Sequence, residues 1–199
     1  MTAREDILNA VRLHHPPSVE LPPVPDFHQP TDDLIDEFTA ALARLDGKCV
    51  TVPPADLQQW LSETFPEAQR TCSAVPELNG TVRPADFHDW AAPADVDVTI
   101  IRSRLGVAET GSILATEKEL GVDTIAVLAQ HLVVLLDPAD LVPNIHDAYR
   151  DRSFQDAAYA VLLSGPSGSA DIGGVTVHPA QGVTTLTVIF SPNQRQPGA

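Results

Sequence analysis

The sequence of 199 residues has few cysteines and no long apolar run, and each shortage excludes a class of protein. Its two cysteines, Cys49 and Cys72, are too few for an ordinary iron–sulfur cluster, so any such cluster would belong to another chain. No stretch approaches the roughly 18 apolar residues of a membrane span, and the first residues lack the pattern of a secretory signal. We therefore expect a cytoplasmic protein with two free thiols and no disulfide.

Basic side chains are also scarce. The chain has 12 lysines and arginines against 27 acidic residues, for a net charge of −15. A surface of this sign repels phosphate backbones and anionic lipid unless a basic patch concentrates positive charge. The nearest approach to such a patch is Arg102 with Arg104, which is too small for a nucleic-acid footprint. The composition therefore argues against nucleic-acid and membrane partners.

Several motifs that carry chemistry are missing as well. The sequence has no G-x-G-x-x-G after a strand, no P-loop, no H-E-x-x-H and no C-x-x-C. Its seven histidines lack the spacing that would place two on one helical face beside a carboxylate, so we predict no metal site. Among them, His131 and His178 differ from the rest only in adjoining predicted strands. Nicotinamide, P-loop and ordinary zinc chemistry thus lose their usual signals.

The chain divides into three parts by its residue pattern. Residues 1–30 combine a short helix, introduced by the capping pair Thr2 and Glu5, with a proline-rich linker. Residues 31–191 carry the apolar pattern of one folded domain, and residues 192–199 are predicted to be a disordered tail. Because the first helix is too short to stand alone in water, we expect it to dock on its own domain or on a partner.

The pattern over 31–191 predicts an α/β fold in which a mostly parallel sheet is flanked by helices. Residues 63–93 are predicted to be irregular, with one or two helical turns around Ala85–Trp90. The predicted helices are Thr31–Leu45, Ala55–Leu61 and a segment from near Pro138 to Tyr149. Short aliphatic runs, several apolar on both faces, are what a buried parallel sheet requires. These runs are Cys49–Val52, Val96–Ile101, Ser112–Ala115, Thr124–Leu128, Leu132–Leu136, Ala160–Leu163 and Leu186–Phe190.

Two loops that contain glycine are the candidate sites. The first, Gly106–Ser112, lies between two predicted strands, where backbone amides and a carboxylate can face a ligand. Its candidate residues are Glu109, Thr110, Gly111 and Ser112. The alternative is a tight turn in which Glu109 caps a helix or pairs with Arg102 or Arg104.

The second loop, residues 164–174, follows the predicted strand Ala160–Leu163. In open α/β sheets ligands bind beyond the carboxyl ends of the strands, and this loop offers free amides and hydroxyls to an anion. Asp171 is its candidate for catalysis or for binding a ligand hydroxyl. The other candidate residues are Ser164, Gly165, Ser167 and Ser169. The alternative is a helix N-terminus capped by Ser167 or Ser169, with Asp171 in the first turn.

The two loops, about 55 residues apart in the chain, carry a resemblance to a known family. Val107–Ser112, and Ser164–Ser167 with Ser169–Ile172, resemble the signature segments of the lactate-utilisation (LUD) domain family, specifically its stand-alone lactate utilization protein C branch. The resemblance covers about Val96–Phe190. It implies an α/β fold related to ribose-phosphate isomerase, glucosamine-phosphate deaminase and the CoA-transferases. The chain departs from the pattern at Gly168, where members usually carry Arg or Lys.

The resemblance also implies a function. It suggests the subunit without clusters in a system that oxidises L-lactate to pyruvate, whose partners are cysteine-rich iron–sulfur subunits. Glu109 and Asp171 would be acid/base or hydroxyl-binding groups in a pocket for a small organic anion or part of an unknown cofactor. Because a pocket on so acidic a chain cannot rely on the overall potential, we expect Arg102 or Arg104 to neutralise the ligand. Two alternatives stay open: a non-catalytic scaffold for the partners, and an isomerase- or ligase-like enzyme acting on a phosphorylated small molecule.

Overall fold

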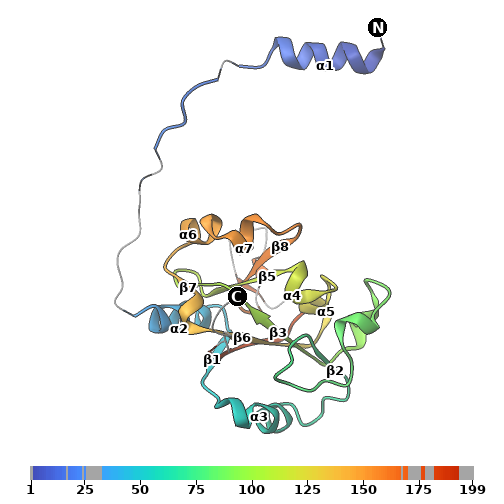
Figure 1. Ribbon diagram of the computed structural model, residues 1–199, viewed down its shortest axis with the longest axis vertical. Helices are drawn as coiled ribbons and strands as arrows, with labels where there is room; N and C mark the ends of the chain where they lie inside the picture. The colour runs from blue at the N-terminus through green and yellow to red at the C-terminus, as the bar shows by residue number, and fades with distance from the viewer. Residues whose placement is uncertain are drawn as a thin grey trace, which may run out of the picture.

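The computed structural model describes residues 2–16, 18–23, 25, 33–166, 168–169, 176–177 and 182–192. Within these residues, the body of the chain is two β-sheets that share a core and have helices around them (Figure 1). Beyond Pro192, the predicted tail lies outside the described residues.

The larger sheet has five strands, all parallel, in the order β1-β11-β6-β3-β2. Its strands are β1 (Lys48–Val50), β2 (Thr71–Ser73), β3 (Val98–Ser103), β6 (His131–Leu136) and β11 (Thr185–Phe190). Five of the six residues of the central strand β6 are buried, as its continuous aliphatic run predicts. The predicted α/β fold with a mostly parallel sheet is confirmed.

The smaller sheet has four strands in the order β7-β4-β5-β8. Its strands are β4 (Gly106–Val107), β5 (Ser112–Thr116), β7 (Leu141–Val142) and β8 (Ala160–Leu163). β4 and β7 are parallel, whereas β5 is antiparallel to both of its neighbours. Two of the aliphatic runs therefore pair with each other here and not within the parallel sheet. β9 (Gly168–Ser169) and β10 (Thr176–Val177) form a separate antiparallel pair.

The helices near the N-terminus lie where the sequence predicts them, whereas those after residue 120 differ from the prediction. The described α-helices are α1 (Ala3–Leu13), α2 (Leu34–Ala43), α3 (Leu57–Thr64), α4 (Glu117–Leu120), α5 (Ile125–Leu128), α6 (Ile145–Arg150) and α7 (Arg152–Gln155). The described residues also contain four 3₁₀ turns, at Pro54–Asp56, Pro84–Asp86, Ala92–Asp95 and Pro138–Asp140. Thr2 and Glu5 form the expected capping box of α1, so the predicted first helix is confirmed.

Three of the predicted elements are wrong. The run Thr124–Leu128 was predicted as a strand but forms the helical turn α5. The prediction failed because periodicity cannot distinguish a helix from a strand over so few apolar residues. The helix expected from near Pro138 is a 3₁₀ turn, strand β7 and then α6. Pro143 explains the break, since a proline keeps the residue before it extended. The stretch 63–93, expected to be irregular, contains β2.

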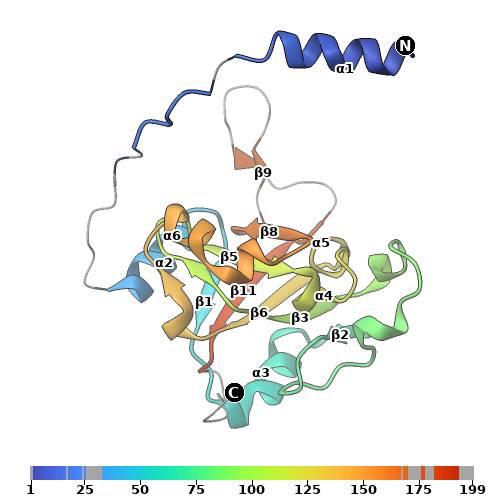
Figure 2. The ribbon, with the colours of Figure 1, turned by 45° about the horizontal axis from the view of Figure 1, so that its top comes forward.

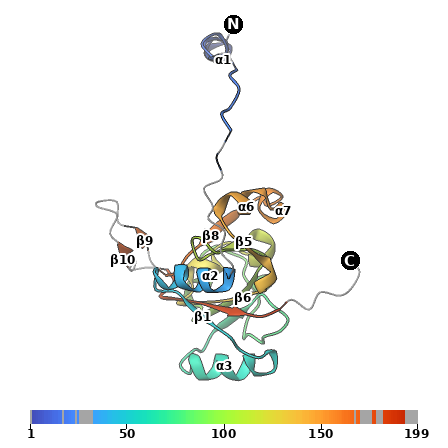
Figure 3. The same ribbon diagram turned by 90° about the vertical axis from the view of Figure 1, so that its left-hand side faces the viewer.

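The two faces of the larger sheet are covered by different layers, which we name the α2 face and the α3 face (Figure 3). On β6, Leu132, Val134 and Leu136 point to the α2 face and pack with α2 and the smaller sheet. Val133 and Leu135 point to the α3 face and pack with α3. The alternation along each strand therefore assigns every side chain of the larger sheet to one face.

Helix α1 lies apart from the body in the views of Figures 1 and 2. None of its residues is buried, and Ile7, Val11 and Leu13 are 64%, 60% and 82% exposed. The expected docking on its own domain is therefore not seen in the described residues. Of the helices in those residues, none is long and apolar enough to cross a membrane.

Candidate functional site

A row of three hydroxyl groups joins the two loops that the sequence marks. Thr110 Oγ1 lies 2.7 Å from Ser112 Oγ, which in turn makes a short hydrogen bond with Ser164 Oγ. The strand register explains the meeting, because Ile113 on β5 pairs with Leu163 on β8. One step further along this antiparallel ladder places Ser112 opposite Ser164. The fold thus brings together residues that are 52 positions apart in the chain.

The two glycines of these loops pack against the same end of α2. Gly111 and Gly165 have backbone φ angles of +62° and +68°, which favour glycine. A Cβ on Gly111 would overlap the backbone of Leu42, and a Cβ on Gly165 would overlap the carbonyl oxygen of Leu45. Both positions therefore need glycine for conformation and for space, and residues 42–45 set the position of both loops.

Glu109 is exposed and holds the start of α6. Its Oε2 accepts a hydrogen bond of 3.2 Å from the backbone N–H of Ile145, the first residue of that helix. A carboxylate at this position is favoured by the helix dipole and by the free N–H groups of the first turn. Of the sequence alternatives, the structure therefore supports the helix cap, while a catalytic role for Glu109 stays a proposal.

Arg102 lies on the other face of the larger sheet from the hydroxyl row. It follows Ile100 by two positions on β3, and Ile100 packs on the α3 face. Its guanidinium forms an ion pair of 2.7 Å with Glu77 and donates a hydrogen bond of 3.2 Å to the carbonyl of Ser191. In the described part of the chain, no hydrogen bond or ion pair links Arg102 to either loop.

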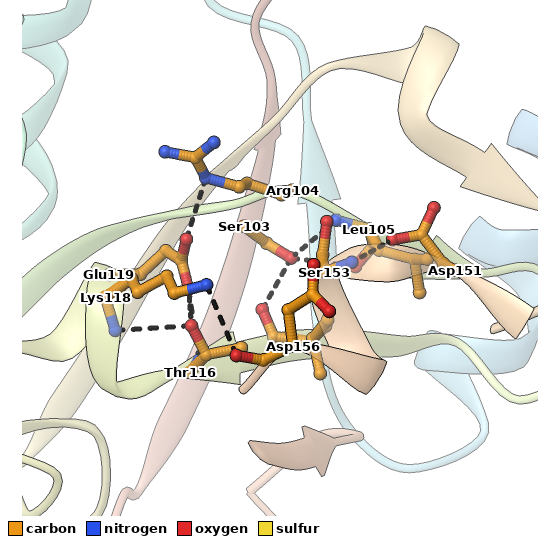
Figure 4. A network of polar contacts seen from close by, with 10 residues as sticks. Ser103, Arg104, Leu105, Thr116, Lys118, Glu119, Asp151, Ser153 and Asp156 are labelled. Carbon is orange, nitrogen blue, oxygen red and sulfur yellow. Dashed lines mark hydrogen bonds and ion pairs between the residues drawn. The ribbon is translucent and has the colours of Figure 1, made fainter. Parts of the chain in front are cut away.

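Arg104 belongs to a polar network around Glu119 (Figure 4). Its Nε lies 2.8 Å from Glu119 Oε1, and the other carboxylate oxygen accepts hydrogen bonds from the backbone and hydroxyl of Thr116. The Glu119 side chain is 8% exposed and that of Arg104 is 67% exposed, so the guanidinium covers the carboxylate from the solvent side. That Arg104 neutralises a ligand also stays a proposal, since no described contact joins it to the hydroxyl row.

The second loop is described only in part. Ser164 and Gly165 are placed as above, whereas the predicted residues Ser167 and Asp171 lie outside the described residues, as does His178. Gly168 and Ser169 form β9 and pair with β10, so Ser169 does not begin a helix. Among the described residues, no three His, Cys, Asp or Glu side chains gather as a metal site requires.

The sequence did not reveal the residues that the two loops pack against, nor a second group of residues on the α3 face. The supporting turn at Leu42 and Leu45 has no polar signature, and only the paired glycines opposite could have signalled it. His131, set apart in the sequence for its position beside a strand, lines a cavity with Trp60 and Phe65 on the α3 face. Two aromatic residues at an interval of five have no motif value, so only the fold reveals this cavity.

Comparisons with known proteins agree with this architecture. The family model described as the LUD domain matches residues 91–191. A solved structure of a DUF162 family protein from Deinococcus radiodurans is similar, with a TM-score of 0.62 and 15% identity over 79% of this chain and 95% of that chain. This likeness bears on the fold alone. No curated protein matches the sequence. Because the family model spans half of the chain, including both loops, this chain belongs to the LUD domain family.

Proposed function

We propose that this chain is the subunit without iron–sulfur clusters in a system that oxidises L-lactate to pyruvate, and that it binds a small organic anion or part of a cofactor beside the Glu109 and Asp171 loops. The proposal places the chain in the cytoplasm, with cysteine-rich iron–sulfur subunits as partners. The LUD domain, a family associated with lactate utilisation, supports this context. The observation that carries the site is the hydroxyl row, since it joins the two loops.

The hydroxyl row can donate to an anion. Thr110, Ser112 and Ser164 hold three hydroxyl hydrogens, and two of them are used within the row. When both bonds run in the same direction, the third is left at one end of the row, where a carboxylate or phosphate oxygen can accept it. Such a charge-assisted hydrogen bond contributes about 1.5–3 kcal/mol. Reversing the row moves the free hydrogen to the other end, so a proton donor can change place without movement of the chain.

Activity of the assembled system tests the proposal. The chain is copurified with its candidate iron–sulfur partners, and lactate oxidation is measured for Glu109→Gln and Asp171→Asn. We expect a loss of tenfold or more in at least one variant, on the order of what removing a general acid or base costs. Asp123→Asn is the control, because it makes the same change of charge at an exposed residue outside both loops. Undiminished turnover in both test variants would remove the site from the mechanism.

A binding screen tests the ligand class without partners. The melting temperature is measured with lactate, pyruvate, sugar phosphates and nucleotides. A ligand at 100 times its dissociation constant adds about 2.7 kcal/mol of apparent stability. Lactate or pyruvate should stabilise the chain, and Ser112→Ala should reduce that effect. Stabilisation by sugar phosphates alone would favour the isomerase- or ligase-like alternative.

The scaffold is the second candidate, and the exposed apolar residues of α1 favour it. Ile7 and Val11 share one face of a helix that packs on nothing in the described residues. A partner groove that covered this face would bury apolar surface at about 25 cal/mol per Å². Deleting residues 1–30 tests this role. Loss of copurification with unchanged binding of small ligands would support the scaffold, whereas retained copurification would contradict it.

A further inference from the structure

A cavity of about 620 Å³ lies on the α3 face of the larger sheet, opposite the hydroxyl row. It lies at the amino ends of three strands, because Lys48, His131 and Thr185 are the first residues of β1, β6 and β11. Its other wall comes from α3 and the residues that follow it. The volume is in the usual range for small-molecule sites.

One wall of this cavity is aromatic. Trp60 and Phe65 meet edge to face, with ring centroids 6.1 Å apart and planes at 88°. Phe65 also lies 4.8 Å from the ring of His131, with planes at 34°. All three side chains are only partly buried, so they present ring surface to the cavity. Such a wall favours flat aromatic ligands, which gain offset or edge contacts with it.

The polar groups of the cavity fix a hydrogen-bonding pattern. His131 Nδ1 lies 2.8 Å from Thr185 Oγ1, which holds the imidazole ring in place. Over the described residues, neither His131 Nε2 nor the indole N–H of Trp60 has a hydrogen-bond partner in the chain. His131 and Trp60 can therefore each offer one ring nitrogen to a ligand, and the ring of His131 is held in place by Thr185.

The charges around the cavity disfavour an anion. Lys48 is the one cation that lines it in the described structure, against the carboxylates of Glu67 and Asp97. Burial lowers the pKa of His131 below its ordinary value, and the Asp97 charge opposes this only in part, so the ring is neutral near pH 7. Hydrogen bonds from the backbone N–H groups of Arg70 and Gln69 lower the pKa of Asp97, which keeps it ionised.

We propose that this cavity binds an uncharged, planar nitrogen heterocycle of the nucleobase type. The ring of the ligand packs against Trp60 and Phe65, and one of its nitrogen or exocyclic groups forms a hydrogen bond with His131 Nε2. This site is separate from the proposed lactate-related site, because the two lie on opposite faces of the sheet. Failure of one proposal therefore leaves the other intact.

Fluorescence of Trp60 provides the test. The chain has two tryptophans, and Trp90 is 72% exposed and does not line the cavity. In a Trp90→Phe background, Trp60 is the single emitter. Adenosine is the probe, because it carries an uncharged nucleobase. We expect saturable quenching of the emission, whereas quenching that rises linearly to millimolar adenosine would overturn the proposal.

Matched variants locate the binding. His131→Ala in the same background should weaken adenosine binding tenfold or more, while His88→Gln, at an exposed histidine outside the cavity, should leave it unchanged. If His131→Ala fails to fold, Thr185→Val serves instead, because it removes the hydroxyl that orients the ring and keeps a similar shape. An unchanged dissociation constant in the folded variant would overturn the proposal. AMP should bind more weakly than adenosine, and tighter binding of AMP would contradict the uncharged ligand class.

Discussion

The two faces of the larger sheet differ in how completely they are covered. The α2 face carries a helix and a second sheet, and glycines at 111 and 165 let the chain approach the end of that helix closely. The α3 face carries one helix of eight residues, which is about 12 Å long, and the segment with Val75 and Leu78. This layer leaves a cavity at the amino ends of β1, β6 and β11.

The difference in cover leaves different side chains accessible on the two faces. On the α2 face, most of the buried hydroxyls are bonded within the protein, as Ser112 is to Ser164 and Ser103 is to the carbonyls of Leu105 and Leu114. On the α3 face, incomplete cover leaves aromatic rings and a histidine in contact with solvent. The well-covered α2 face therefore favours a small ligand at its rim, and the less covered α3 face admits a larger, flat ligand.

The largest expected effect on stability comes from a substitution that prevents the Gly165 loop from packing closely against the end of α2. Gly165→Ala should lower the free energy of unfolding by about 3 kcal/mol, because the methyl group meets the Leu45 carbonyl and the backbone φ is positive. Gly182→Ala is the control, since its φ is also positive but the nearest atom, Val127 O, lies at 3.4 Å. Urea unfolding measures both. Equal losses would show that conformation alone, and not crowding, sets the need for glycine.

A smaller effect should follow from cutting the hydroxyl row. Ser112→Ala leaves Thr110 and Ser164 without their shared partner and should cost about 1–2 kcal/mol of unfolding free energy. Ser164→Ala and the double variant complete a thermodynamic cycle. We expect a coupling energy of at least 0.5 kcal/mol, roughly the minimum for residues in one network. Strictly additive losses would contradict the direct bond between the loops.

His131 on the α3 face should make the stability of the chain depend on pH. Burial lowers the pKa of His131 in the folded chain, so the unfolded chain binds the proton more readily. The stability that comes from the neutral ring is present above the ordinary histidine pKa, about 6.5, and is lost as the pH falls below it. Between about pH 7.5 and 5.5, wild type should therefore lose more stability than His131→Gln. Equal losses in urea unfolding would contradict this; Asp97, Glu67 and Lys48 are the charged groups around this ring.

The smallest expected effect concerns the reactivity of the two thiols, which measures how well each strand covers its cysteine. Burial raises the pKa of Cys72 to about 11, with the Asp86 charge adding to the effect, and burial also raises the pKa of Cys49. Both thiols are free and pack toward the α2 face, but Cys49 is only partly buried. With a disulfide reagent on the native chain, Cys49 should react roughly tenfold faster than Cys72. Equal rates would show that β1 covers its thiol as well as β2 does.

The fold was predictable where a run was long and apolar on both faces. The run Leu132–Leu136 indicates a central parallel strand and forms one. β2 could not be found in this way, because Thr71–Ser73 has no apolar run and is a strand only through its pairing with β3. The same limit explains α5, whose few apolar residues fit either period.

In the candidate site, the contact between the two loops could not be predicted from the sequence. The resemblance marks both loops, but the contact of Ser112 with Ser164 depends on the antiparallel pairing of β5 and β8, which no local pattern reports. Arg102 was expected to neutralise a ligand at these loops, because the chain as a whole is acidic. The alternation of β3 turns it to the other face, where it pairs with Glu77.

Gly111 and Gly165 both pack against residues 42–45, and this contact limits which changes of sequence the protein can accept. An insertion or deletion in that turn would displace both loops at once, so compensating changes in two separate loops would be needed to restore them. Surface loops ordinarily accept such changes of length at little cost. This turn is exposed in part, yet its length is set by two distant segments, and it should therefore keep its length in relatives whose other loops vary.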